Sequence, residues 1–335
     1  MFFSLMLAVI IAVSLVATQA GQVAFFKLRA YAHGGVFFIK SKDLPKTFNG
    51  SNYIKMESNH AYVNGRRTIR VVFIRHGQSV WNSLFNSLNA GLPMRWVKAV
   101  IRESICLFTD PFDSLIIDSP LSSKGRKEAN ELASFVRAAN GKISVDPNTS
   151  VIVASNLRRA METALVGLGP RISTTNEQIV MDSSLQEGSK NIDAQTISTE
   201  PNKIAPVPIG SIKEAKQLVQ AFDPYLNAGD KVIGVDVYQR MDVFVRHLFG
   251  ASGDDSLLTS NKRGNAELKE VIVVGHSGYF RNFFRRFLPT SSKHIAKASK
   301  MQNCAVVAFN FVHNESNGEL SVEEESIQIL YKGFK

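Results

Sequence analysis

The sequence predicts an α/β fold with three layers: a mostly parallel central sheet with helices on both of its faces. Short runs rich in Val, Ile and Phe, which suit buried strands, alternate with segments whose apolar residues recur at helical spacing. Such alternation is typical of a parallel sheet that helices cover on both sides. The chain has 335 residues, of which 44% are hydrophobic, so it is long enough and apolar enough to bury a sizeable core.

The elements follow one another from residue 69 onward. The first strand ends at Ile74, and Ser122 is expected to N-cap a helix that stops at Asn140-Gly141. A helix over 94–108 is also compatible with the pattern. The other expected strands are 150–154, 179–181, 270–274, 305–311 and 327–331, and the other expected helices are one that ends near 168, 236–249 and 279–288.

The first 26 residues differ in composition from the rest of the chain. No charged side chain precedes Lys27, and residues 2–16 are almost wholly apolar. Because this apolar stretch together with residues 17–26 is about long enough to cross a bilayer, we expect residues 1–26 to be a signal peptide or a membrane anchor. The expected location is membrane-associated or in the secretory pathway. Topology stays open, because positive residues follow the segment while three glycosylation sequons begin at Asn49, Asn148 and Asn314.

Residues 27–68 are expected to form an N-terminal extension rich in turns. Gly34-Gly35 is a turn signal, and Asn64-Gly65 can close a hairpin onto the strand at Ile69. The formal net charge of +10 is consistent with a phosphorylated partner or an anionic surface. The two cysteines lie far apart in the sequence, which indicates neither a zinc site nor a disulfide framework.

One segment mixes basic and aromatic residues as some nucleic-acid binders do. In Arg281–Phe287, however, the helical period places the phenylalanines on a buried face. We therefore expect no nucleic-acid partner.

The most informative motif is Arg75-His76-Gly77, which closes the first strand. At the carboxyl end of a strand in an α/β sheet, side chains face the crevice where ligands bind. An imidazole there can act as a nucleophile, and the guanidinium beside it can hold an oxyanion. By itself the tripeptide is weak evidence, because a histidine at a strand end is usually a polar cap.

The surrounding sequence resembles the histidine phosphatase superfamily, which includes the cofactor-dependent phosphoglycerate mutases. The resemblance covers residues 69–331 and rests on five segments in the family's order. These segments are Arg75-His-Gly-Gln-Ser-Val-Trp-Asn82, Ser119-Pro-Leu-Ser-Ser-Lys-Gly125, Ser155-Asn-Leu-Arg-Arg-Ala-Met-Glu-Thr-Ala164, Leu185-Gln-Glu187 and Val274-Gly-His-Ser-Gly278. It implies a histidine phosphatase domain over 69–335, with insertions near 83–117 and 195–212.

The resemblance also implies a set of site residues and no metal or cofactor. His76 would be the nucleophile, and Glu187 would be the proton donor. Arg75, Arg159 and His276 would supply positive donors to the phosphoryl oxygens. Substrate-binding roles are implied for Gly77, Ser79, Asn82 and Ser277.

Each of these residues has a structural alternative. His276 follows a buried strand and can be a satisfied strand-end histidine, and Glu187 can be an ordinary loop acid. Arg158 and Arg159 can be solvated on a first helical turn, and the family pattern Leu-x-Arg-Ala selects Arg159. Ser79 and Asn82 can serve only to hydrogen-bond the turn.

The expected function is a phosphomonoester hydrolase that acts through a phosphohistidine. A mutase is the first alternative, although Glu187 is followed by Gly188-Ser-Lys-Asn191 rather than by the Arg-His-Tyr-Gly of phosphoglycerate mutases. A catalytically inactive membrane adaptor is the second. The expected partners are a phosphorylated small molecule or phosphoprotein as substrate, and a membrane through the N-terminal segment.

Overall fold

The computed structural model describes residues 6, 13, 18–44, 65–85, 91–109, 113–139, 141–205, 209–212, 215–250 and 268–335. The α-helices are α2 (Gln19–Lys40), α3 (Val80–Phe85), α4 (Leu92–Thr109), α5 (Ser123–Ala138), α6 (Arg158–Gly167), α7 (Gly169–Thr175), α8 (Ala215–Ala221), α9 (Val237–Phe249) and α10 (Ser277–Phe287). The strands are β1 (Arg66–Arg75), β2 (Ser150–Ala154), β3 (Ile179–Asp182), β4 (Phe222–Leu226), β5 (Glu270–Gly275), β6 (Val306–Asn314), β7 (Glu319–Val322) and β8 (Gln328–Tyr331). The short 3-10 helices are η2 (Ser183–Leu185), η3 (Ile192–Ala194), η4 (Ile295–Lys297) and η5 (Glu324–Ser326).

One sheet runs through the molecule in the order β4-β3-β2-β5-β1-β6-β7, and β8 pairs with β6. Strands β1 to β5 are parallel to one another, whereas β6 is antiparallel to β1, β7 and β8. The mostly parallel sheet predicted from the sequence is therefore confirmed. Strand β1 lies between β5 and β6, so its carboxyl end falls in the interior of the sheet.

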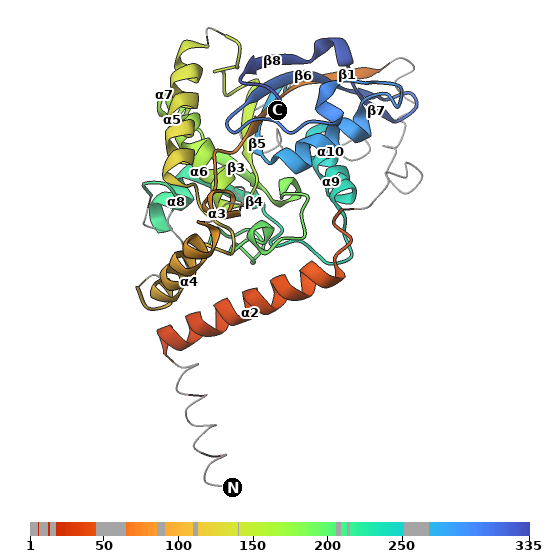
Figure 1. The fold of residues 1–335 in the computed structure, drawn as a ribbon. Coiled ribbons are helices and arrows are strands. Elements are labelled where there is room, and N and C mark those ends of the chain that lie inside the picture. Colours follow the sequence, from red (N-terminus) through yellow and green to blue (C-terminus); the bar gives the residue numbers. More distant parts are fainter. Residues whose placement is uncertain are drawn as a thin grey trace.

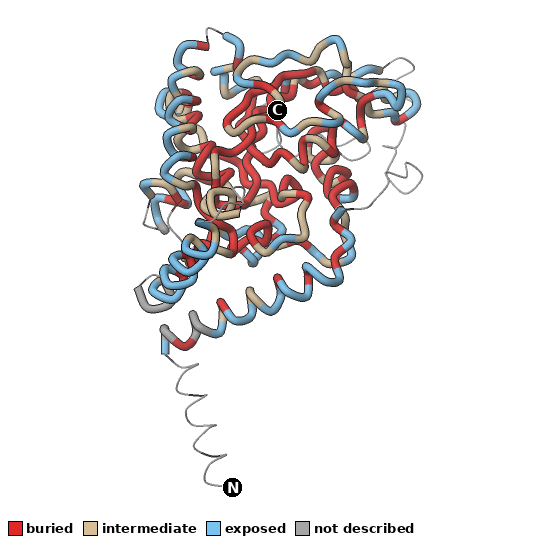
Figure 2. The backbone as a smooth tube through the Cα atoms, in the orientation of Figure 1, coloured by how far each residue is buried: buried red, intermediate tan, exposed pale blue. Residues whose placement is uncertain are grey.

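Helices cover both faces of the sheet, as the sequence predicts (Figure 1). The alternation of side chains along β1 divides the apolar interior into two cores. Val71 and Phe73 point into the core shared with α9 and α10, while Val72 and Ile74 point into the core shared with α5 and α6. Figure 2 shows the buried backbone concentrated between these layers.

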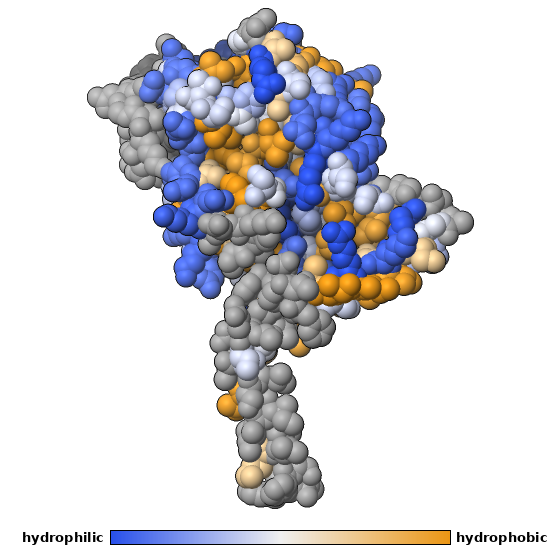
Figure 3. Space-filling view, turned by 90° about the vertical axis from the view of Figure 1, so that its left-hand side faces the viewer, coloured by the Kyte–Doolittle hydropathy of each residue, from blue (hydrophilic) through white to orange (hydrophobic). Residues whose placement is uncertain are grey.

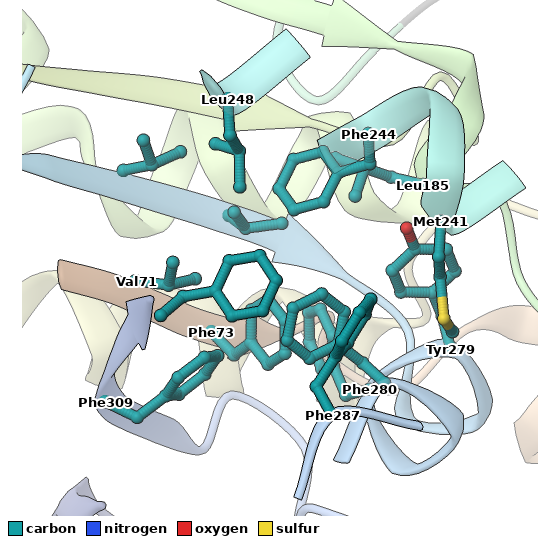
Figure 4. Packing of buried hydrophobic residues seen from close by; sticks show 14 of the residues in the cluster. Val71, Phe73, Leu185, Met241, Phe244, Leu248, Tyr279, Phe280, Phe287 and Phe309 are labelled. Carbon is teal, nitrogen blue, oxygen red and sulfur yellow. The ribbon is translucent and has the colours of Figure 1, made fainter. Parts of the chain in front are cut away.

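Aromatic rings dominate the first of these cores (Figure 4). Phe73 of β1 stacks on Phe280 of α10, with ring centroids 4.0 Å apart, and meets Phe309 of β6 edge-on at 4.9 Å. Aromatic pairs in these arrangements contribute about 0.5–1.5 kcal/mol beyond the area they bury. These contacts bind the start of α10 to β1, and both elements carry candidate site residues.

Local sequence signals account for several helix starts. Ser122 caps α5 by accepting a hydrogen bond from the Gly125 amide at 3.1 Å, as predicted. Asp236 and Gln239 form a reciprocal capping box at the start of α9. Strand β4 was not expected, because Asp223 and Pro224 within it disfavour a strand.

Residues 19–40 form one continuous helix, and the turn predicted at Gly34-Gly35 is wrong. Helix α2 runs straight through both glycines and across the expected boundary at residue 26. Gly34 faces the body of the protein, where an added Cβ would meet the Ile192 side chain at 2.7 Å. The hairpin turn predicted at Asn64-Gly65 lies partly outside the described residues.

The expectation of a membrane-associated or secretory protein needs correction. Among the described residues, no helix is long and apolar enough to cross a membrane. Helix α2 carries Lys27, Arg29 and Lys40, and it packs against α4 through Lys27 and Tyr31, which both contact the Glu103 carboxylate. Residues 1–5, 7–12 and 14–17, on which most of the predicted signal peptide or anchor falls, lie outside the described residues.

The helix expected over 94–108 is present as α4, inside the predicted insertion at 83–117. It leaves Met94, Val97 and Ile101 exposed on neighbouring turns. Hydrophobic side chains also reach the surface between hydrophilic ones on the face of the molecule in Figure 3.

Candidate active site

The two candidate histidines are brought together by the register of two parallel strands. Arg75 at the end of β1 pairs with Gly275 at the end of β5, so the next residues, His76 and His276, leave the sheet side by side. Their ring centroids are 5.0 Å apart, and both side chains are buried. The carboxyl edge of the sheet is therefore the place where the site forms.

The imidazole of His76 is held in one tautomer. Its Nδ1 lies 2.6 Å from the Gly77 carbonyl oxygen, which only accepts, so Nδ1 carries the proton and Nε2 keeps its lone pair. Burial, together with the charges of Arg159 and Arg75, lowers the pKa of His76 well below its ordinary value. The ring is consequently neutral at physiological pH, as a nucleophile must be.

Gly77 is required by close packing. A Cβ on Gly77 would lie 2.6 Å from the carbonyl oxygen of Gly125, and a Cβ on Gly125 would overlap the Gln78 backbone. The loop after β1 and the first turn of α5 therefore touch through two residues that have no side chain. The Gly77 amide also donates to the Thr163 hydroxyl at 3.1 Å, which ties the loop to α6.

Two buried arginines contribute positive charge beside His76. Arg75 donates to the Met301 carbonyl at 2.6 Å, and burial lowers its pKa while the charge of Glu187 opposes that shift. Arg159, on the first turn of α6, donates to the Asp193 carbonyl at 2.7 Å. Both guanidinium groups are nearly inaccessible to solvent, so their charge acts at low effective dielectric.

Arg158 is buried and points elsewhere, contrary to its reading as a solvated cation. Its guanidinium pairs with the Asp113 carboxylate at 2.6 Å and donates to the Ser114 carbonyl. Its backbone amide donates to Asp118 at 2.7 Å. Arg158 thus anchors the start of α6, while Arg159 faces the histidines.

His276 is oriented by a serine. Its Nε2 lies 2.9 Å from Ser155 Oγ, and its Nδ1 has no hydrogen-bond partner among the described residues. Burial, with the charge of Arg159, lowers the pKa of His276 well below its ordinary value. A buried ring with one nitrogen unpaired is able to contact an anion that enters the site.

Glu187 reaches the same place from a different loop. Its carboxylate accepts a hydrogen bond from the Tyr279 amide at 3.2 Å, in the first turn of α10. Gly278 makes room for it, because a Cβ there would overlap Glu187 Oε1. Burial raises the pKa of Glu187, although the charges of Arg159 and Arg75 oppose this. A carboxyl group in this environment retains its proton to a higher pH than an exposed one.

The remaining predicted substrate-binding residues are near the loop, and their roles stay predictions. Ser79 is buried, and its hydroxyl accepts a hydrogen bond from the Asn82 amide at 3.1 Å. Asn82 lies half-buried on α3. Ser277 directly follows His276 as the first residue of α10.

The cluster also has the spacing of a metal site. One ligand atom each from His76, Glu187 and His276 lie within 4.8 Å of one another. Two nitrogens and a carboxylate oxygen suit a divalent ion such as zinc. The charges of Arg75 and Arg159 disfavour a cation at this point and favour an anion.

Several supporting residues were not identified from the sequence. Ser155 lies within the quoted second arginine motif, directly after β2, and its position was the available signal. Asp193 belongs to none of the five motif segments, yet its carboxylate lies 3.7 Å from Arg159. Asp43 and Lys231 carried no signal, because they are far from every motif.

Two cavities lie beside helix α2. One of about 470 Å³ separates α2 from the loops 195–201 and 228–233, and its lining includes Arg29, His33 and Lys231. Another of about 370 Å³ adjoins it over 197–205. None of the predicted catalytic residues lines either cavity.

Comparisons with known proteins find structural likeness and no sequence match. No protein-family model matches the chain, and no curated protein does. Among solved structures, a mycobacterial glucosyl-3-phosphoglycerate phosphatase is 17% identical over 79% of this chain and 99% of its own, with a TM-score of 0.37. A phosphoglycerate mutase from Bacillus anthracis is 16% identical over 79% of this chain and 94% of its own, with a TM-score of 0.39.

A structure described as mycobacterial hydrolase 1 is 17% identical over 80% of this chain and 100% of its own, with a TM-score of 0.39.

Proposed function

We propose that this protein is a phosphomonoester hydrolase that transfers the phosphoryl group first to His76 and then to water, without a metal ion. The observation that carries the proposal is the group of His76, Glu187 and His276, in which both histidines are buried and one ligand atom of each residue lies within 4.8 Å of the others. A phosphoryl group bound beside these atoms would meet the charges of Arg75 and Arg159, which a transferring phosphoryl group requires.

In the first step, His76 Nε2 attacks phosphorus as the bond to the ester oxygen breaks. The proton stays on Nδ1, which donates it in a hydrogen bond to the Gly77 carbonyl, so the ring accepts the phosphoryl group in the orientation that it already has. The protonated carboxyl of Glu187 donates its proton to the departing alkoxide. The products of this step are a free alcohol and a phosphohistidine.

In the second step, water attacks the phosphohistidine. Glu187, now ionised, removes a proton from the water as the phosphorus–nitrogen bond breaks. Inorganic phosphate leaves, and the Nε2 lone pair and the Glu187 proton are restored. His276 and the two arginines hold the equatorial oxygens in both steps.

A mutase remains the runner-up function. It would require a second phosphate site to retain the intermediate while it turns. Lys190 is the nearest basic residue after Glu187, and one lysine is thin support. An inactive adaptor is disfavoured, because every residue of the family pattern that catalysis needs is present and the buried cluster is assembled.

The proposal is tested by trapping the intermediate. Incubating the wild-type protein briefly with ³²P-labelled phenyl phosphate and quenching it should give a phosphoenzyme that survives alkali and is lost in acid. His76→Ala should form none, and its kcat/KM should fall by at least 10³-fold, since the nucleophile is gone. The proposal fails if His76→Ala retains activity within tenfold of wild type.

A further inference from the structure

Asp43, the third residue after α2, is the acidic centre of a buried ion-pair network. Its carboxylate accepts hydrogen bonds from Lys231 Nζ at 3.1 Å and from Arg240. The side chains of Asp43 and Lys231 are fully inaccessible to solvent, and that of Arg240 is 7% exposed. An ion pair in such a place costs several kcal/mol of desolvation per charge, so its geometry must be well satisfied.

All three residues of this network hold the loop that carries Glu187. Lys231 Nζ donates to the Glu187 carbonyl at 3.1 Å and to the Ser189 carbonyl at 2.7 Å, so that with Asp43 its three protons are used. Arg240 donates to the Gln186 carbonyl at 3.2 Å. Asp43 itself accepts from the Ser189 amide at 2.9 Å.

Helix α2 also contacts the short helix η3, which holds Arg159 in place. Gly34 packs on Ile192, in the short helix η3, and the next residue is Asp193. The carbonyl and carboxylate of Asp193 are the groups that orient Arg159. Figure 1 shows α2 crossing the edge of the domain, and its carboxyl end lies beside α9, where the Asp43 carbonyl accepts from the Val237 amide at 3.2 Å.

We propose that α2 and Asp43 are part of the active site: Asp43 is a positioning residue that, through Lys231 and Arg240, holds Glu187 at the distance from His76 that proton donation requires. The inference rests on the proposed function, since it assigns Asp43 to the acid step of that reaction. This assignment gives the N-terminal segment a role in catalysis. The sequence does not predict that role, because Asp43 is far in sequence from every motif.

The backbone of the loop is the part that needs this support. Between η2 and η3 the chain has no regular secondary structure to orient it. The Glu187 side chain is held by the Tyr279 amide at one end, and its own carbonyl is held by Lys231 at the other. Without Asp43, Lys231 and Arg240 would lose their counter-ion and would redirect towards solvent or other acceptors.

The test separates proton donation from phosphoryl binding in the full-length protein. Asp43→Asn should lower kcat for an alkyl phosphate by at least 30-fold, because that leaving group needs the proton from Glu187. The same variant should lower kcat for p-nitrophenyl phosphate by less than threefold, since p-nitrophenolate leaves unprotonated. KM for both esters should change by less than threefold.

Glu177→Gln is the matched control. The Glu177 side chain is 9% exposed and pairs with a buried arginine, Arg171, at 2.5 Å, but it lies at the amino edge of the sheet, next to the start of β3. It should leave both rates within twofold of wild type. Equal slowing of the two esters by Asp43→Asn, or no slowing of either, would overturn the assignment.

A second variant covers the case in which Asp43→Asn does not fold. Asp43→Asn combined with Lys231→Met removes one cation with the anion, so the net charge of the network is unchanged and Arg240 alone remains. It should reproduce the selective loss on the alkyl phosphate. The proposal would be contradicted if this variant folds and hydrolyses the alkyl phosphate and p-nitrophenyl phosphate at the same ratio of rates as wild type.

Two neighbouring glycines test the role of α2 independently of charge. Gly34→Leu should displace η3 and raise KM for both esters at least fivefold, because Arg159 binds the phosphoryl group common to them. Gly35→Leu adds the same side chain one position away, where an added Cβ meets no atom within 4 Å, and should change neither KM. Equal effects of the two substitutions would exclude this contact as a support of the site.

Hydrogen exchange distinguishes failure of this inference from failure of the proposed function. Exchange of the amides of residues 186–189 should be faster in Asp43→Asn than in wild type, whatever the protein catalyses. If the wild-type protein hydrolyses neither ester, the proposed function fails, while faster exchange in Asp43→Asn still supports the inference that Asp43 holds the Glu187 loop. Exchange that is the same in Asp43→Asn as in wild type would overturn the role of Asp43 in holding the loop, even if the enzyme is active.

Discussion

At the scale of single residues, burial separates the protonation states that the chemistry needs. Burial lowers the pKa of His76 and of His276 well below their ordinary values, and it raises the pKa of Glu187. Neutral imidazoles therefore coexist with a protonated carboxyl group over a range of pH. A nucleophile and an acid can in this way be ready at the same time.

The pH dependence and a substitution at Glu187 test that separation. The rate of alkyl phosphate hydrolysis should fall as pH rises through the raised pKa of Glu187, because the acid is lost, whereas His76 stays neutral down to pH values below about 6.5. Glu187→Gln should slow alkyl phosphates by roughly 10²–10⁴-fold and abolish the alkaline fall. Steady-state rates from pH 4 to 9 check both.

p-Nitrophenyl phosphate is the control for this substitution, since its leaving group needs no proton. Equal slowing of both esters by Glu187→Gln would move the acid role to another residue. Asp193 would then be examined first, because burial raises its pKa and it lies beside Arg159. Asp182 is a weaker candidate, since its carboxylate pairs with His247.

Removal of metal ions tests whether the cluster binds a phosphoryl group or a cation. Activity should survive dialysis against EDTA with less than twofold loss, because Arg75 and Arg159 supply the charge that a metal would otherwise supply. Added zinc should inhibit, because His76, Glu187 and His276 have ligand spacing and a bound ion would occupy the nucleophile. Loss of activity in EDTA that Mg²⁺ or Zn²⁺ restores would instead assign a metal-dependent mechanism.

At the scale of elements, the ends of parallel strands and the starts of helices assemble the site. Strands β1 and β5 end in register, and each delivers a histidine. Helices α6 and α10 begin at the same edge, and they provide Arg159 and the amide that binds Glu187. Free amides at a helix start favour negative charge, which a carboxylate or a phosphate can provide.

The cap of α9 gives a stability prediction at this scale. Asp236→Ala should lower the free energy of unfolding by about 1 kcal/mol, because its carboxylate accepts from the amides of Tyr238 and Gln239 at 2.8 and 2.9 Å. Urea unfolding followed by circular dichroism measures the change. Asp236→Asn retains a capping oxygen and should cost at most a few tenths of a kcal/mol.

At the scale of the whole molecule, the cores on the two faces of the sheet support its carboxyl edge, where charged side chains are buried. The aromatic core on one face and the aliphatic core on the other hold β1 between them. Helix α2 adds to this edge from the N-terminal side, through Lys27 to α4 and through Asp43 to the Glu187 loop. Residues 18–44 thus belong to the folded structure around the candidate site.

The sequence by itself determined the class of fold, the order of most elements and the candidate residues on β1, α6 and α10. Those features depend on local rules: side-chain alternation in strands, helical periodicity, capping residues and short motifs at strand ends. Ser122, for example, was identified as a helix cap from its neighbours alone, and the structure confirms it.

The tertiary structure alone decided what lies between elements far apart in the sequence. Gly34-Gly35 resembles a turn locally, but packing of Gly34 on Ile192 favours a continuous helix. Asp43 reaches Lys231 across 188 positions, and no local pattern encodes such a pairing. Burial, which sets the pKa of His76 and of Glu187, is likewise a property of the assembled chain, because neighbours in space and not in sequence exclude the water.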